Sequence, residues 1–178
     1  MSIKNYYPQF EEIPYKRTKV DMPVVVLFAR SLVGQYAKEV VRIAYVIFRN
    51  ESFNGLLGVN NNYAGIQADN GEWSGLDLSH VNGTCVKTDN AGDSRRFICF
   101  DDQGFEVGFN FLCSKIEHRN MYALQETLPG IDDAEFRKIA IGLYHQYESK
   151  WVANSKEDTG EELVNFISLY RSSIKAIF

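Results

Sequence analysis

Four segments of the chain carry apolar residues at every third or fourth position, the spacing that gathers them on one face of an α-helix. The first segment covers residues 32–50. Its apolar positions are Tyr36, Val40, Ile43, Ala44, Ile47 and Phe48, and its charged positions include Lys38, Glu39, Arg42 and Arg49. Because the charged positions fall elsewhere on the helical wheel, the pattern predicts an amphipathic helix with these four side chains away from the core.

The other three helical patterns cover residues 105–116, 136–147 and 163–174. Each follows polar residues of the kind that cap a helix by accepting hydrogen bonds from the N–H groups of its first turn. The candidates are Asp101 and Asp102 for the first, Asp132 with Glu135 for the second, and Thr159 with Glu162 for the third. The last two pairs have the spacing of a capping box.

Two strands are predicted between the first and second helices. The stretches "GTCVKT" and "RRFICF" flank "DNAGDS", whose Asn, Gly and Asp residues suit a hairpin turn. Four helices and one small hairpin predict a mostly helical α+β fold. A length of 178 residues favours one domain over residues 1–178. Residues 1–22 lack a periodic pattern and are predicted to form an irregular arm that packs over the body of the domain.

Charge and hydropathy exclude several classes of partner. The net charge is −4 and no block of Lys and Arg occurs, which argues against nucleic acid as a partner. The longest apolar run, "MPVVVLFA", is far shorter than the roughly 20 residues that cross a bilayer. We therefore expect no membrane span. The polar N-terminus does not resemble a secretory signal, so synthesis in the cytoplasm is expected. We also expect a monomer.

Neither metal nor cofactor chemistry is indicated. Cys85, Cys99 and Cys113 have spacings unlike a metal site and lie among apolar residues, so they are interpreted as reduced core thiols. A disulfide between two of them is the alternative. The three histidines are scattered, and no phosphate-binding glycine motif or hydrolase nucleophile motif occurs. The sequence predicts no metal and no cofactor.

A carboxylate stands where the first helix ends. Glu51 follows Ile47 by four positions and Phe48 by three, so a helix continuing that far directs Glu51 from the apolar face. Apolar neighbours and the negative end of the helix dipole would both favour its protonated form. A protonated carboxyl group can donate its proton to a leaving group, as the cleavage of a glycosidic bond requires. The alternative is a surface glutamate just past the last turn.

The chain after Glu51 is rich in Gly and Asn. The stretch "NNNYAGIQ" at residues 60–67 concentrates amides, a tyrosine and a glycine, which are groups able to line a groove for sugar hydroxyls and acetamides. Its alternative is an asparagine-rich turn. Trp73 could stack on a sugar ring, or it could pack half-buried against the core. Both interpretations of each feature stay open at this point.

The pair Glu51-Ser52 and the stretch "NNYAGIQ" resemble the Glu-Ser and Asn-aromatic-x-Gly-Ile arrangement of the lysozyme-like superfamily. The likeness is closest to bacterial N-acetylglucosaminidases of the flagellar and autolysin type, with a fainter similarity to soluble lytic transglycosylases. A second stretch, "RRFICFDDQGFEVGFNFL", is similar to the strand and helix behind the groove of those enzymes. The resemblance implies a lysozyme-like helical domain with a hairpin beside a substrate groove.

The resemblance also implies roles for individual residues in the cleavage of peptidoglycan. Glu51 would be the general acid, Ser52 would position its loop, and Gly65 would allow close approach of the backbone. Residues implied to contact the sugar are Asn62, Tyr63 and Gln67. A second catalytic carboxylate is left open among four residues, with Asp69 placed first. The four are Asp69, Glu72, Asp89 and Asp93.

Two other functions compete with this one: a non-catalytic glycan-binding or virion structural module that keeps the scaffold, and an unrelated helical interaction protein. An enzyme that acts on the cell wall must reach it, so we expect delivery as a phage product or by a secretion apparatus.

Overall fold

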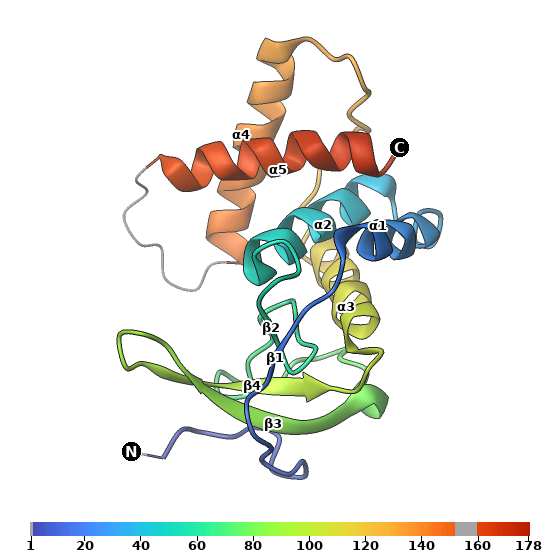
Figure 1. The fold of residues 1–178 in the computed structure, drawn as a ribbon. Helices are drawn as coiled ribbons and strands as arrows, with labels where there is room; N and C mark the ends of the chain where they lie inside the picture. The colour runs from blue at the N-terminus through green and yellow to red at the C-terminus, as the bar shows by residue number, and fades with distance from the viewer. Residues whose placement is uncertain (1, 152–159) are drawn as a thin grey trace. The chain divides into compact units, whose positions relative to one another are not determined.

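A computed structural model describes residues 2–151 and 160–178. Within them the fold is α+β and mostly helical, as predicted (Figure 1). The α-helices are α1 (Met22–Ser31), α2 (Lys38–Ser52), α3 (Gly104–His118), α4 (Asp133–Lys150) and α5 (Glu161–Ala176). The strands are β1 (Arg17–Thr18), β2 (Gly58–Val59), β3 (Val81–Thr88) and β4 (Ser94–Phe100), and a 3-10 helix covers Leu78–His80.

All four predicted helices are present, and α1 is an additional one. It forms from the run "MPVVVLFA", which is apolar throughout and therefore gives no periodic signal. Pro23 stands in its first turn, where a missing N–H group costs nothing. The predicted arm is not wholly irregular either, because β1 pairs antiparallel with β2 at Arg17–Val59 and Thr18–Gly58.

The chain forms two compact units. Met1–Val25 and Phe48–Leu112 form one, called here the hairpin unit, and Val26–Ile47 and Cys113–Phe178 form the other, the helical unit. The boundary between them falls inside α2 and inside α3. A single domain over the whole chain stays a prediction.

The hairpin unit is built around β3 and β4, the predicted hairpin. Their register runs from Val81 opposite Phe100 to Thr88 opposite Ser94. Backbone hydrogen bonds in which Ile13 donates and Glu11 accepts cover the free edge of β3. Backbone hydrogen bonds in which Ala68 donates and Ile66 accepts cover the free edge of β4. The arm and the 66–68 segment therefore protect both hairpin edges from pairing with other chains. The arm also buries Tyr7, of which 4% is exposed.

The core of the hairpin unit joins the end of α2 to the loop that follows it. Phe48 stacks on Tyr63 with ring centroids 5.4 Å apart, and its ring also meets Phe109 of α3 at 5.7 Å. All three rings are buried. Aromatic pairs at these separations contribute about 0.5–1.5 kcal/mol beyond the burial of their area. They hold residues 60–66 against the helix end.

The helical unit is held largely by aromatic contacts between α4 and α5. Phe136 stacks on Tyr170 at 5.7 Å, and Tyr147 meets Phe166 at 5.6 Å. Asp132 caps α4 as predicted, because its carboxylate accepts from the N–H groups of Ala134 and Glu135. The predicted cap of α5 is wrong: Gly160, in the left-handed conformation and without a side-chain bond, precedes that helix. Thr159 lies outside the described residues.

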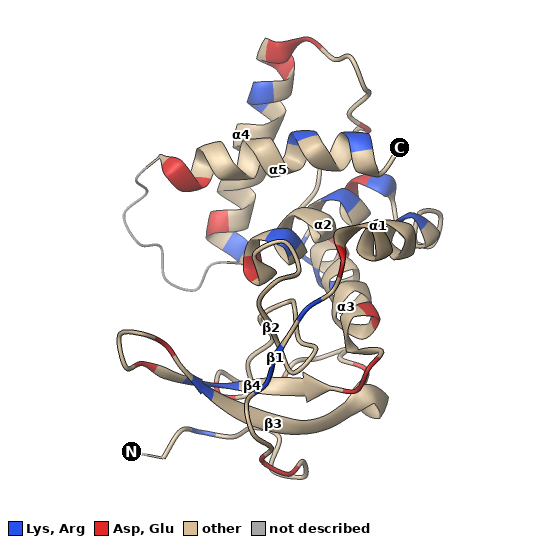
Figure 2. Ribbon diagram, in the orientation of Figure 1, with Lys and Arg blue, Asp and Glu red and all other residues tan. Residues whose placement is uncertain are grey.

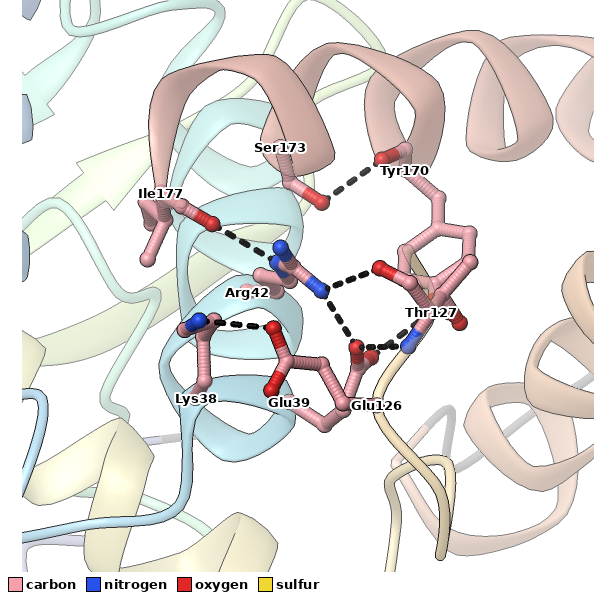
Figure 3. Close-up of polar contacts among 8 residues, drawn as sticks. All are labelled: Lys38, Glu39, Arg42, Glu126, Thr127, Tyr170, Ser173 and Ile177. Carbon is pink, nitrogen blue, oxygen red and sulfur yellow. Dashed lines mark hydrogen bonds and ion pairs between the residues drawn. The ribbon is translucent and has the colours of Figure 1, made fainter. Parts of the chain in front are cut away.

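A buried ion pair on α2 is the main departure from the helical-wheel prediction (Figure 3). Glu39 and Arg42 were expected away from the core, yet only 3% and 0% of them is exposed. The guanidinium donates from Nη1 to Glu39 Oε1 at 2.5 Å and from Nε to the carbonyl of Ile177 at 2.8 Å. The carboxylate of Glu39 also accepts from the Thr127 N–H and from the Tyr170 hydroxyl. This polar cluster is covered by α5 and by the residue 127 segment, so the polar side of α2 is not solvated here.

Candidate functional site

All the residues predicted to form the site belong to the hairpin unit. Glu51 lies in the last turn of α2, and Ser52 ends the helix. The Ser52 hydroxyl donates to the carbonyl of Phe48 at 2.6 Å and accepts from the N–H of Gly55 at 2.9 Å. Because both bonds are local and the side chain is fully buried, Ser52 holds the turn after Glu51 and does not face solvent.

The backbone reverses immediately after this helix. Phe53, Asn54 and Gly55 have φ angles of 48°, 57° and 80°, so three successive residues are left-handed. A bulky residue in this region is strained, and surrounding bonds must hold it there. The Gly55 N–H donates to the Ser52 hydroxyl, and the Asn54 N–H donates to the Arg49 carbonyl. These two hydrogen bonds hold the reversed backbone in place. The chain therefore turns away from the helix axis and returns through residues 60–67.

The returning loop meets the Glu51 carboxylate at Gly65. A Cβ atom at Gly65 would lie 2.9 Å from Glu51 Oε2, which is closer than real Cβ contacts. Gly65 also has a φ of 66°, where a side chain is strained whatever the available space. The structure thus brings Glu51 and Gly65 together, and glycine is needed at position 65 for both steric and conformational reasons.

Of the two interpretations of Glu51, the structure agrees with a surface glutamate. Continuation of the helix would have directed its carboxylate among apolar neighbours, but Glu51 is exposed to solvent. The reason is the helix end at Ser52, because no further turn follows to cover residue 51.

Asn62 and Tyr63 lie inside the unit. Only 2% of Asn62 is exposed, and its amide donates to the carbonyls of Ile66 and Ile98. Tyr63 is 3% exposed, and burial raises the pKa of its phenol while a hydrogen bond with Thr18 lowers it. Neither side chain faces solvent, so neither lies where a groove-lining residue would. They fix the shape of the loop that carries Gly65.

Gln67 and Trp73 are joined to each other. The indole N–H of Trp73 donates to the Gln67 carbonyl at 2.6 Å, and the ring packs edge-on against Phe111 at 5.4 Å. Trp73 is half-buried, so of its two interpretations the structure confirms packing on the core. The Gln67 side chain is also half-buried. Of the implied sugar contacts, Gln67 is the one with side-chain exposure.

Asp69, the first candidate for a second carboxylate, is part of the sheet edge. Its Oδ2 accepts from the backbone N–H of Arg96 at 3.0 Å, which continues the pairing of residues 66–68 with β4. Its Oδ1 is buried and has no hydrogen-bond partner among the described residues. Asp89 is occupied differently, because its carboxylate accepts from the N–H groups of Ala91 and Asp93 in the hairpin turn. Glu72 and Asp93 are exposed.

The cysteines occupy the core positions predicted for them. Cys85, Cys99 and Cys113 are free and buried. Burial raises the pKa of the Cys113 thiol, which keeps it protonated and unreactive. No group of His, Cys, Asp or Glu within residues 2–151 and 160–178 has the arrangement of a metal site. No helix in the same residues is long and apolar enough to cross a membrane.

Comparisons of the chain with protein-family models, curated proteins and solved structures give no match. Support for a function therefore comes from the sequence motifs and from the geometry of the hairpin unit. Sequence reasoning overlooked one feature of that unit: the register brings Lys87 directly opposite Arg95. Counting outwards from the "DNAGDS" turn could have found this pair.

Proposed function

We propose that the protein is a peptidoglycan hydrolase that cuts the glycan strand between N-acetyl sugars, with Glu51 as the general acid. The observation that carries the proposal is the carboxylate of Glu51 at the helix end, within 2.9 Å of the space that a Gly65 Cβ would fill. Gly65 carries no side chain, so the acid meets bare backbone there. The Glu-Ser and Asn-Tyr-x-Gly-Ile-Gln motifs support the same assignment.

In this mechanism a glycan strand lies over the 62–67 loop and covers Glu51. Exclusion of water by the bound sugar favours the protonated carboxyl group, which then donates its proton to the glycosidic oxygen. The exposure of Glu51 in the unliganded protein is compatible with this sequence of events, because substrate supplies the desolvation. Ser52 and Asn62 act as positioning residues, since their bonds fix the helix end and the loop.

A non-catalytic glycan-binding module is the second candidate. The exposure of Glu51 favours it, because solvent favours the charged carboxylate over the protonated form that a general acid requires. The polar groups of Asn62 and Trp73 also have partners inside the unit. Such a module would bind cell-wall polymer without cutting it.

The test compares Glu51→Gln with Glu11→Gln, a matched change at another exposed glutamate of the hairpin unit that is not a catalytic candidate. Release of reducing sugar from purified sacculi is measured for both variants and for the unchanged protein. A lost general acid should lower the rate about 100-fold or more, whereas Glu11→Gln should leave it unchanged.

Circular dichroism and thermal melting establish that both variants are folded. A folded Glu51→Gln variant that releases sugar at the original rate would refute the role of Glu51. Binding of the unchanged protein to sacculi, without any release of sugar, would favour the glycan-binding module.

A further inference from the structure

Two cations face each other on the hairpin close to its turn. Lys87 of β3 stands directly opposite Arg95 of β4, so both side chains project from the same face of the hairpin. Arg95 is exposed and Lys87 is half-exposed. Figure 2 shows Lys and Arg positions, in blue, on both strands of the hairpin towards its turn.

An aromatic ring lies beside this pair. The Lys87 ammonium lies 5.7 Å from the ring centroid of Tyr15, and 41% of that tyrosine is exposed. Within the part of the chain that the structure describes, neither Lys87 nor Arg95 forms an ion pair with a carboxylate. Asp89, the acidic residue that directly follows β3, uses its carboxylate to hold the turn. We call Tyr15, Lys87 and Arg95 the basic cluster.

Like charges directly opposite each other destabilise a pair of strands. The hairpin does not need them, because a neutral polar side chain at either position would serve the solvated end of the sheet equally well. An anionic group placed between the two cations would convert the repulsion into two attractions. The electrostatic energy of the two cations is thus less favourable in the free protein than in a complex with an anion.

We propose that the basic cluster binds the free carboxylates of the peptide stems on peptidoglycan. The assignment rests on the proposed function for its choice of polymer, and the cluster belongs to the same unit as Glu51. The guanidinium of Arg95 presents a planar fork that matches a carboxylate, and the ammonium of Lys87 adds a second charge. The exposed ring of Tyr15 offers an amphipathic surface beside them for a peptide or a sugar.

The test variant is Lys87→Gln combined with Arg95→Gln. The control is Arg137→Gln combined with Lys138→Gln, which removes the same charge from exposed positions of α4. Binding is measured by pelleting with sacculi at low and high salt, and with insoluble chitin, a neutral N-acetylglucosamine polymer. A Glu51→Gln background is added to each protein to prevent digestion during the measurement.

The hairpin variant should bind sacculi about tenfold more weakly at low salt and lose most of the salt dependence. It should also melt at a higher temperature, because the repulsion between the strands is removed. The control variant should match the parent in both binding and salt dependence. Chitin should be bound equally by all the proteins, since it carries no carboxylate.

Unchanged binding of the hairpin variant to sacculi would overturn the proposal, as would an equal loss in the control variant. Vesicles of anionic lipid that bind the parent more tightly than sacculi, through the same two cations, would assign the cluster to a membrane surface instead. If the protein with Glu51 intact releases no sugar, while binding still depends on the basic cluster, the binding site is supported and the hydrolase is refuted. The two proposals therefore fail separately.

Discussion

Replacement of Arg42 by alanine is expected to be among the most destabilising single changes in the helical unit. The substitution removes three hydrogen bonds, from Nη1 to Glu39 and Thr127 and from Nε to Ile177. It leaves the Glu39 carboxylate buried and without its counter-charge, although the Thr127 N–H and the Tyr170 hydroxyl still donate to it. Breaking a buried ion pair from one side typically costs about 3–5 kcal/mol.

The neighbouring Lys38→Ala variant is the control. Lys38 also forms an ion pair, at 2.6 Å with Glu126, but 25% and 45% of these side chains is exposed. A solvated pair of this kind contributes less than about 1 kcal/mol. The two variants remove cations four positions apart on the same helix, so the difference between them reports burial and not helix propensity.

Urea unfolding provides the assay, and one tryptophan lies in each unit. Trp73 belongs to the hairpin unit and Trp151 to the helical unit, so Trp→Phe backgrounds give separate fluorescence signals. With a urea dependence of about 2 kcal/mol per M, a loss of 4 kcal/mol lowers the midpoint by about 2 M. Lys38→Ala should lower it by less than about 0.5 M. Equal midpoints for the two variants in the Trp151 signal would show that the buried pair contributes no more than an exposed one, and would refute the reasoning.

Two other perturbations test the hairpin unit. Gly65→Ala should lower the free energy of unfolding by about 1–2 kcal/mol for its left-handed backbone, and further because Glu51 must be displaced. Gly75→Ala is the control, because Gly75 has a φ of 78° and open space for a Cβ, so the change isolates the backbone cost. Equal melting temperatures for these two variants would contradict the contact with Glu51. The hydrogen bond to Asp101 raises the pKa of His80 above its ordinary 6.5, so its stabilisation is complete below pH 6.5 and is lost as pH rises through the folded-state pKa. An NMR titration of His80 with a midpoint below 6.5 would contradict this direction.

Local sequence signals located most of the elements. The periodic spacing in α2, α3, α4 and α5 required only that one side of each helix be buried, and the "DNAGDS" turn required only short-range hydrogen bonds that the Asp89 carboxylate accepts. The cap at Asp132 is equally local. The run "MPVVVLFA" became a helix although an unbroken apolar run is compatible with either strand or helix.

The candidate site was predictable in its components and less so in their environment. The motifs identified Glu51 and Gly65, and these two are in contact. The sequence left the exposure of Glu51 open and did not predict the burial of Tyr63, because both depend on where α2 ends and on how the following loop returns to it. A difference of one turn at a helix end changes what covers the last side chain.

The sequence by itself determined four of the α-helices, the hairpin and the glycine requirement of the loop, since these follow from spacing and backbone conformation over a few residues. Only the tertiary structure decided that Glu39 and Arg42 are buried. The physical reason is that burial and charge pairing depend on partners such as Thr127 and Tyr170, which lie about 90 to 130 positions further along the chain. A polar side chain that is buried needs a hydrogen-bond or charge partner, and the tertiary structure determines whether one lies within reach.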